Sequence, residues 1–154
     1  MSEGLDLAAV LPQLMRLGTV FNRSQLVERA MEEAAVPVDR PGLTVLITLR
    51  MADRPLRVGE IAARMQVVGP HVTRHLHDLE RAGLVRRVVD PDDQRARLVE
   101  LTDAGAGAAG RYLDTILGWF TGAVADWPAD DRATFGRLLS RFVADLQERV
   151  ADLD

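Results

Sequence analysis

The sequence predicts a mainly α-helical chain that carries one small β-hairpin and has long helices at both ends. Apolar residues recur at three- and four-residue steps over most of the 154 residues, which is the period of an amphipathic helix. Two short apolar runs, 84–89 and 97–101, interrupt this pattern and are separated by turn-forming residues. The length suits one domain, or one small module whose flanking helices complete their core elsewhere.

Four helices are expected before the hairpin. The first spans about 5–35, with Pro12 bending or delaying its first turn, and the others span about 41–52, 58–66 and 70–82. Pro70 fits the first turn of the fourth helix, and Gly83 is suited to end it.

Two long amphipathic helices are expected after the hairpin. Thr102 can cap a fifth helix that runs to about residue 124, and the acids after Pro128 suit the first turn of a sixth that runs to about residue 153. These helices have no sheet to cover. We therefore expect their apolar stripes to meet each other and the first helix, within one chain or across two.

The order of helix, short turn, helix and basic hairpin is the plan of a winged helix-turn-helix, in which the second helix of the pair enters the DNA major groove. Val72, Leu76 and Leu79 share one face and should anchor this helix in its core. The outward and flanking positions then carry the hydrogen-bonding side chains that base reading requires, namely His71, Thr73, Arg74, His75 and His77. A polar, solvated helix face is the alternative interpretation.

The charge distribution favours a local DNA-binding face. The chain carries −4 overall, but the segment from Arg54 to Arg97 holds nine Arg and six acids, a net of +3. The sequence has no run of eighteen apolar residues, and its acidic N-terminus lacks the positive flank of a signal peptide, so we expect a cytoplasmic protein without a membrane partner. The absence of cysteine excludes disulfides, thiolate metal clusters and cysteine nucleophiles.

Three segments, in this order and spacing, resemble the MarR-type winged-helix regulators of bacteria and archaea, which are named for multiple antibiotic resistance. The segments are Val72-Thr73-Arg74 followed by 79–87, the turn at 90–95, and the stretch 98–105. The resemblance implies a homodimer that binds a pseudo-palindromic operator in double-stranded DNA and usually represses until a small molecule intervenes. It divides the chain into an N-terminal dimerisation helix (1–36), a DNA-binding lobe (37–102) and C-terminal dimerisation helices (103–154).

The resemblance also assigns roles in the wing. Asp93 would brace the wing, and Arg95 would enter the minor groove, where A·T-rich stretches concentrate negative potential. Arg97 lies on the same side as Arg95 and would serve as a phosphate contact or a brace. The recognition helix starts with Gly69-Pro70 where the family often has Ser or Thr, so a phosphate contact by a capping hydroxyl does not transfer. The DNA-binding set is therefore Pro70, His71, Thr73, Arg74, His75, His77, Arg95 and Arg97.

Two further sets of residues follow from this plan. Apolar residues of the terminal helices are the candidates for dimerisation, namely Leu7, Leu11, Leu14, Phe135, Leu138, Phe142 and Leu146. By resemblance, an effector pocket would lie between the first, second and fifth helices, with the candidate lining residues Met15, Phe21, Leu46, Arg50 and Tyr112. Each lining residue also fits an ordinary role in a core or an interface.

Two patterns suggest other chemistry and are set aside. Residues 105–110 spell GxGxxG, but a dinucleotide-binding unit needs a second parallel strand after the helix, and helix is expected there. His71, His75 and Asp78 have a spacing that could hold a divalent metal, but they lie on the expected DNA-reading face. The serines have no nearby His and no nucleophile elbow. We expect no metal, no cofactor and no enzymatic activity.

The leading hypothesis is a dimeric, sequence-specific transcriptional regulator, acting as a repressor, that a small-molecule effector releases from DNA. The alternative is a constitutive DNA-binding repressor without a ligand, or an architectural protein. An enzyme or ligand-binding dimer that had lost DNA binding would be expected to lack the basic wing, which this chain keeps.

Overall fold

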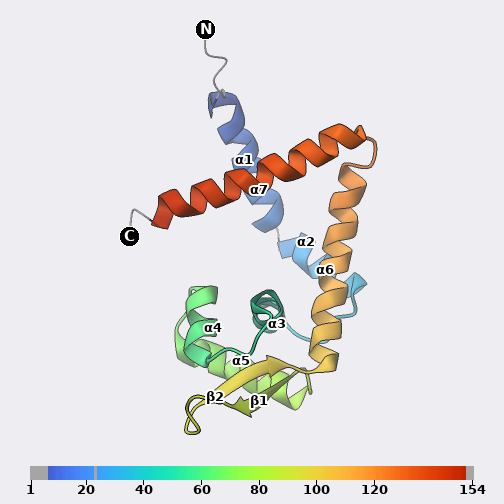
Figure 1. Ribbon diagram of the computed structural model, residues 1–154. Helices are drawn as coiled ribbons and strands as arrows, with labels where there is room; N and C mark the ends of the chain where they lie inside the picture. Colours follow the sequence, from blue (N-terminus) through green and yellow to red (C-terminus); the bar gives the residue numbers. More distant parts are fainter. Residues whose placement is uncertain (1–6, 23, 152–154) are drawn as a thin grey trace. The chain divides into compact units, whose positions relative to one another are not determined.

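A computed structural model describes the backbone of residues 7–22 and 24–151, and the side chains of residues 8–20 and 25–151. The chain forms two compact units that divide after Ile116, within one long helix. The first unit contains the hairpin and most of the helices (Figure 1).

The N-terminal segment contains the helices α1 (Leu7–Asn22) and α2 (Ser24–Glu33); the expected helix over about 5–35 includes residue 23, which lies outside the described residues. Pro12 lies inside α1. The end of α2 is held by Arg111, whose Nε donates to the carbonyl oxygen of Ala34 at 2.9 Å.

Three helices pack together to form the core of the first unit: α3 (Arg40–Ala52), α4 (Val58–Met65) and α5 (Gly69–Arg81) (Figure 1). The bounds match the sequence expectations within a residue. Asp39 caps α3, since its Oδ1 accepts a hydrogen bond from the backbone N–H of Gly42 at 2.9 Å. The largest fully buried side chains in this core are Leu46, Leu56, Ile61, Leu76, Leu79, Val45, Val72 and Val99.

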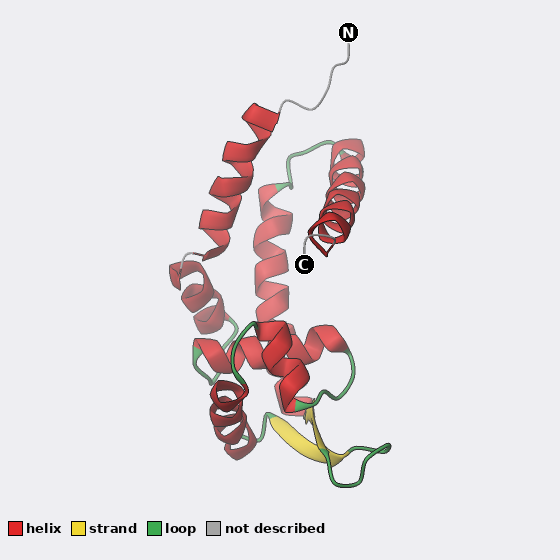
Figure 2. Ribbon diagram, turned by 90° about the vertical axis from the view of Figure 1, so that its left-hand side faces the viewer, coloured by secondary structure: helices red, strands yellow, loops and turns green. Residues whose placement is uncertain are grey.

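The wing consists of β1 (Val85–Val89) and β2 (Arg97–Leu101), which pair antiparallel with Val85 opposite Leu101 and Val89 opposite Arg97. Gly83 ends the preceding helix with a φ of 71°, a conformation that glycine adopts at little cost. Leu56, just before α4, exchanges two backbone hydrogen bonds with Val99 at 3.0 and 2.8 Å. In Figure 2 the yellow strands end in a green loop that projects beyond the helices of this unit.

The helix α6 (Asp103–Ala123) starts against the base of the wing. Thr102 caps it by accepting a hydrogen bond from the backbone N–H of Gly105 at 3.1 Å, and the Thr102 hydroxyl donates to the carbonyl oxygen of Gly83 at 2.6 Å. A Cβ at Gly105 would lie only 1.9 Å from the carbonyl oxygen of Leu84. Gly105 is therefore in close packing contact with the residue that precedes β1, whereas Gly110 of the same glycine-rich stretch has open space around it.

The second unit contains the end of α6 and the helix α7 (Ala129–Ala151). A ring contact between Trp127 and Phe135, with centroids 5.5 Å apart, closes the turn before α7. None of the described residues of α7 is buried, although the helix carries an apolar stripe. Across the described residues as a whole, no helix is long and apolar enough to cross a membrane.

Candidate nucleic-acid interface

The recognition helix α5 has one buried face and one exposed polar face. Val72, Leu76 and Leu79 are at most 1% exposed, as the sequence analysis expected. The opposite positions are exposed, and among them Arg74 forms no hydrogen bond or ion pair with any residue that the structure describes. The hydroxyl of Thr73 donates to the carbonyl oxygen of Gly69 at 3.1 Å, which leaves its lone pairs available as acceptors. The exposed residues from the predicted set are Pro70, His71, Thr73, Arg74 and His77.

His75 departs from the expectation that it points outward, because it is only 8% exposed. It lies three residues after Val72 and four before Leu79, and this spacing places it in the buried stripe of the helix. Its Nδ1 lies 3.9 Å from Oδ2 of Asp39, and its ring meets that of His71 edge-on with centroids 4.7 Å apart. His75 thus packs α5 against the start of α3 and offers little surface to DNA.

The carboxylates of the wing loop accept hydrogen bonds from the backbone of the same loop. Oδ1 of Asp90 accepts from the backbone N–H of Asp92 at 2.9 Å, and Oδ1 of Asp93 accepts from that of Arg95 at 3.0 Å. Arg97 donates from one guanidinium nitrogen to the carbonyl oxygens of Gln94 and Ala96, both at 2.9 Å. Asp93 and Arg97 therefore both bond to the backbone of the loop, which is the geometry that a brace of the wing requires.

Sequence reasoning missed the strongest anchor of the wing, an ion pair between Arg57 and Asp90. The Arg57 guanidinium donates to Oδ2 of Asp90 through Nε at 2.9 Å and through a terminal nitrogen at 2.6 Å. Asp90 is 5% exposed. The hydrogen bond from the Asp92 backbone, followed by that from Arg57, lowers the pKa of Asp90 below its ordinary value of 3.8, although burial acts in the opposite direction. The partners are 33 residues apart, so no local pattern could have joined them.

The basic residues of this lobe divide into those that form ion pairs within the protein and those that do not. Four of the nine Arg between Arg54 and Arg97 pair with acids of the lobe: Arg54 with Glu60, Arg57 with Asp90, Arg86 with Glu100, and Arg87 with Glu80. By contrast, Arg74 and Arg95 are exposed and form no ion pair with a described acid. The guanidinium groups left for an outside anion therefore include one on the recognition helix and one at the wing tip.

The residues expected to line an effector pocket do not gather in one place. Leu46 is in the core, Met15 is 68% exposed, and the side chain of Phe21 lies outside the described residues. Tyr112 lines a pocket of about 200 Å³ with Val27 of α2 and with residues of α3, namely Arg40, Leu43, Thr44 and Ile47. Burial raises the pKa of Tyr112, so its phenol stays protonated as a donor.

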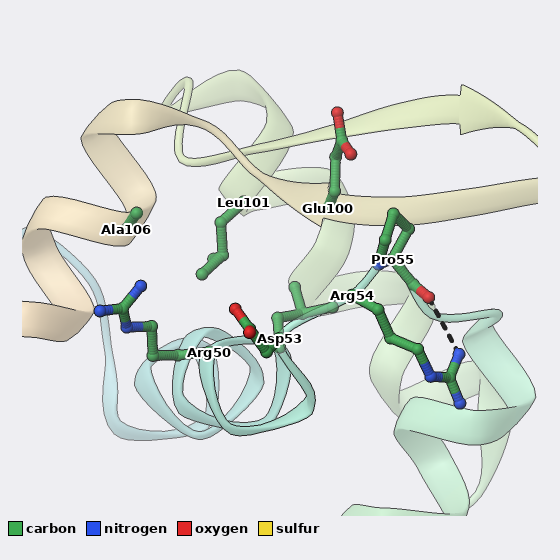
Figure 3. Close-up of a pocket in the computed structure, with 8 residues that line it drawn as sticks. Arg50, Asp53, Arg54, Pro55, Glu100, Leu101 and Ala106 are labelled. Carbon is green, nitrogen blue, oxygen red and sulfur yellow. Dashed lines mark hydrogen bonds between the residues drawn. The ribbon is translucent and has the colours of Figure 1, made fainter.

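Arg50 lines a separate pocket of about 250 Å³ between α3, β2 and the start of α6. In Figure 3, Arg50 lies at the end of this pocket marked by Ala106, and Arg54 lies at the end marked by Pro55. A terminal nitrogen of Arg54 donates to the carbonyl oxygen of Pro55 at 3.1 Å, and the guanidinium also pairs with Glu60. Among the described residues, no group of three or more His, Asp or Glu side chains, the set of His71, His75 and Asp78 included, is placed to hold a metal ion.

Comparisons with known proteins agree with this geometry. Residues 40–96 match the model of the MarR family. The HTH-type transcriptional regulator YdgJ of Bacillus subtilis is 36% identical over 73 residues, which cover 47% of this chain and 44% of YdgJ. The chain thus spans less than half the length of this curated relative.

Solved structures share the fold over nearly whole chains. A MarR family protein from Bacillus stearothermophilus has a TM-score of 0.76 at 21% identity, over 91% of this chain and 95% of that one. MepR of S. aureus, in a mutant bound to an oligodeoxyribonucleotide, has a TM-score of 0.61 at 21% identity, over 88% of this chain and 97% of MepR. MepR has also been solved bound to ethidium bromide, with a TM-score of 0.61 at 22% identity, over 88% of this chain and 95% of MepR. The match to the MarR family model thus covers the helix-turn-helix and the first strand of the wing, and solved MarR family proteins share the fold of this chain.

Proposed function

We propose that this chain is a sequence-specific DNA-binding transcriptional regulator. The observation that carries the proposal is that one lobe has two exposed Arg side chains on different elements. Arg74 lies on the recognition helix, and Arg95 lies on a wing that is held by Arg57 and Asp90. A helix of this size fits the major groove, and an arginine on a wing fits the minor groove. The oligonucleotide complex of MepR is the corresponding observation on a relative.

The DNA-contacting residues that we propose are Pro70, His71, Thr73, Arg74 and His77 from α5, with Arg95 from the wing tip. Arg97 acts as a brace, because its guanidinium is bonded to two carbonyl oxygens of the loop. Asp93 belongs to the same support, since it holds the backbone N–H of Arg95. His75 is withdrawn from the contact set because it is buried.

We further propose that the functional unit is a homodimer with a two-fold symmetric operator. Leu11, Leu14, Phe135, Leu138, Phe142 and Leu146 are all between 38% and 59% exposed, and a second copy would cover such apolar surface. The seventh candidate, Leu7, has a side chain that lies outside the described residues.

Repression and its release by a small molecule complete the proposal. The pocket lined by Arg40, Thr44 and Tyr112 is the site that we assign to the effector, because it combines apolar walls with a cation and a phenol donor. The ethidium complex of MepR is the precedent in a relative. Release of the protein from its operator by screened small molecules, and loss of that release in Thr44→Trp, would test this part. A regulator of this kind acts on chromosomal DNA in the cytoplasm and needs no enzymatic activity.

The test compares two arginine variants on two DNAs. Arg74→Ala should weaken binding to an operator selected from a random pool by about 1 to 3 kcal/mol and relax the preference at one base position. Arg149→Ala, on the exposed end of α7, is the matched control and should leave the affinity within about twofold. Fluorescence anisotropy at constant salt measures both affinities.

The same titration on scrambled DNA separates base reading from phosphate binding. A phosphate contact weakens all sequences alike, whereas a base contact acts on the operator alone. Equal losses of affinity on the two DNAs would mean that Arg74 contacts a DNA phosphate and not a base. A wild-type protein that binds operator and scrambled DNA with the same affinity would refute the proposed function.

A further inference from the structure

One pair of side chains, Arg57 and Asp90, connects the start of the wing loop to the residue before α4. Arg57 is the residue before the first turn of α4, and its guanidinium reaches Asp90 at the point where the wing loop begins. The side chain of Asp90 is 7% exposed, whereas that of Arg57 is 51% exposed. Two donors from Arg57 meet a single carboxylate oxygen, Oδ2, and leave Oδ1 to the backbone N–H of Asp92.

Arg57 is itself held in position on its backbone side. Oε2 of Glu60 accepts the backbone N–H of Arg57 at 2.8 Å, and Oε1 of the same carboxylate accepts from Arg54 at 2.7 Å. Leu56, one residue earlier, is bonded to Val99 of β2 through both of its backbone groups. The middle of β2 is therefore held by Leu56, and the start of the wing loop is held at Asp90 by the next residue, Arg57.

A chain of short hydrogen bonds leads from Asp90 to the wing tip. Asp90 holds the backbone N–H of Asp92 through Oδ1, and its carbonyl oxygen accepts from the backbone N–H of Asp93 at 3.3 Å. Asp93 in turn holds the backbone N–H of Arg95. A shift of the Asp90 carboxylate therefore moves the backbone that carries the Arg95 side chain.

From this geometry we infer that Arg57 is a positioning residue for the wing, and that its ion pair with Asp90 sets how strongly the protein prefers DNA with a narrow, A·T-rich minor groove beside each half-site. The inference rests on the proposed function, since it concerns how that DNA interface selects its target. Arg57 touches neither groove in this role, and it acts through the place it gives to Arg95.

The experiment uses two operators with identical half-sites, one flanked by A·T pairs and the other by G·C pairs. Wild type should prefer the A·T-flanked DNA. Arg57→Ala and Asp90→Asn should each remove that preference, with a loss of roughly tenfold on the A·T-flanked DNA and little loss on the other. Arg57→Lys, which keeps one donor toward Asp90, should restore part of the preference. Arg149→Ala is the control, because Arg149 is an exposed arginine of α7, outside the lobe that holds Arg57 and the wing.

A double-mutant cycle supplies a readout that a purely structural role would not change. Arg57→Ala combined with Arg95→Ala should lose no more flank preference than Arg95→Ala alone, whereas Arg57→Ala and Arg74→Ala should lose affinity additively. Equal loss on both operators in Arg57→Ala would mean a direct phosphate contact and would overturn the inference. A flank preference that Arg57→Ala retains would also overturn the inference. In either case, the proposed function still holds if the wild-type protein binds its operator specifically. If wild type itself ignores sequence, both fail together.

Discussion

The side chains of Asp90 and Asp93 explain how an acidic loop can face a polyanion. Each carboxylate accepts a backbone N–H two residues further along the chain, and Asp90 is buried as well. The negative charge of the loop is thus used to shape its backbone and to bind Arg57. Arg95 is exposed, so the group that the proposed function directs toward DNA is a cation.

The close approach of α6 to the start of the wing at Gly105 leads to a specific prediction about stability. A Cβ at this position would overlap the carbonyl oxygen of Leu84, so Gly105→Ala must shift either helix or wing. We expect a loss of about 1 to 3 kcal/mol in the free energy of unfolding, as for overpacked sites. Urea unfolding followed by circular dichroism measures it.

Gly110→Ala is the matched control in the same helix. Its Cβ would meet nothing within 4 Å, so relief from the helix cost of glycine should raise stability by up to about 1 kcal/mol. Opposite signs for the two variants would support the packing contact. A Gly105→Ala protein as stable as wild type would show that helix and wing are not in close contact there.

Among the elements, those with local signals were predictable from the sequence. The bounds of α3, α4, α5 and both strands agree with the expected ranges because Pro70, Gly83 and Thr102 mark helix ends by their own backbone chemistry. The wing anchor was not predictable, since Arg57 and Asp90 meet only after folding. His75 was misassigned because a polar residue can occupy a buried stripe when its ring packs, and polarity alone does not reveal this.

The wing as an element should respond to acid through Asp90. The pKa of Asp90 is lowered in the folded state, so its contribution to stability is complete above the ordinary value of 3.8 and is lost as the pH falls through the lower, folded value. The free energy of unfolding of wild type should therefore exceed that of Asp90→Asn most at about pH 5 or above, and the difference should shrink toward pH 2.

Denaturant titrations at several pH values measure this difference. Asp92→Asn is the loop-matched control, because the Asp92 side chain is exposed and forms no hydrogen bond or ion pair with a described residue, and it should show a smaller pH-dependent difference. A difference between wild type and Asp90→Asn that stays constant or widens on acidification would contradict the assigned role.

At the scale of the whole molecule, the terminal helices carry the exposed apolar surface on which the proposed homodimer rests. One recognition helix reads only a few base pairs, and the 23-residue α7 leaves Phe135, Leu138, Phe142 and Leu146 exposed. Two-fold symmetry would cover this apolar surface and present two recognition helices to one face of a duplex. The apolar stripes of the sequence alone led to the same dimer prediction, but the sequence did not indicate that residues before and after Ile116 form separate compact units.

Hydroxyl-radical footprinting of the wild-type protein on a selected operator tests the central proposal most directly, because it reports DNA contact, sequence selection and symmetry together. We predict two protected half-sites related by two-fold symmetry, with centres about 10 base pairs, or a multiple of that, apart. Arg95→Ala should remove the protection in the minor groove that flanks each half-site. A single unpaired site, or protection that is the same on unrelated DNA, would contradict the proposal.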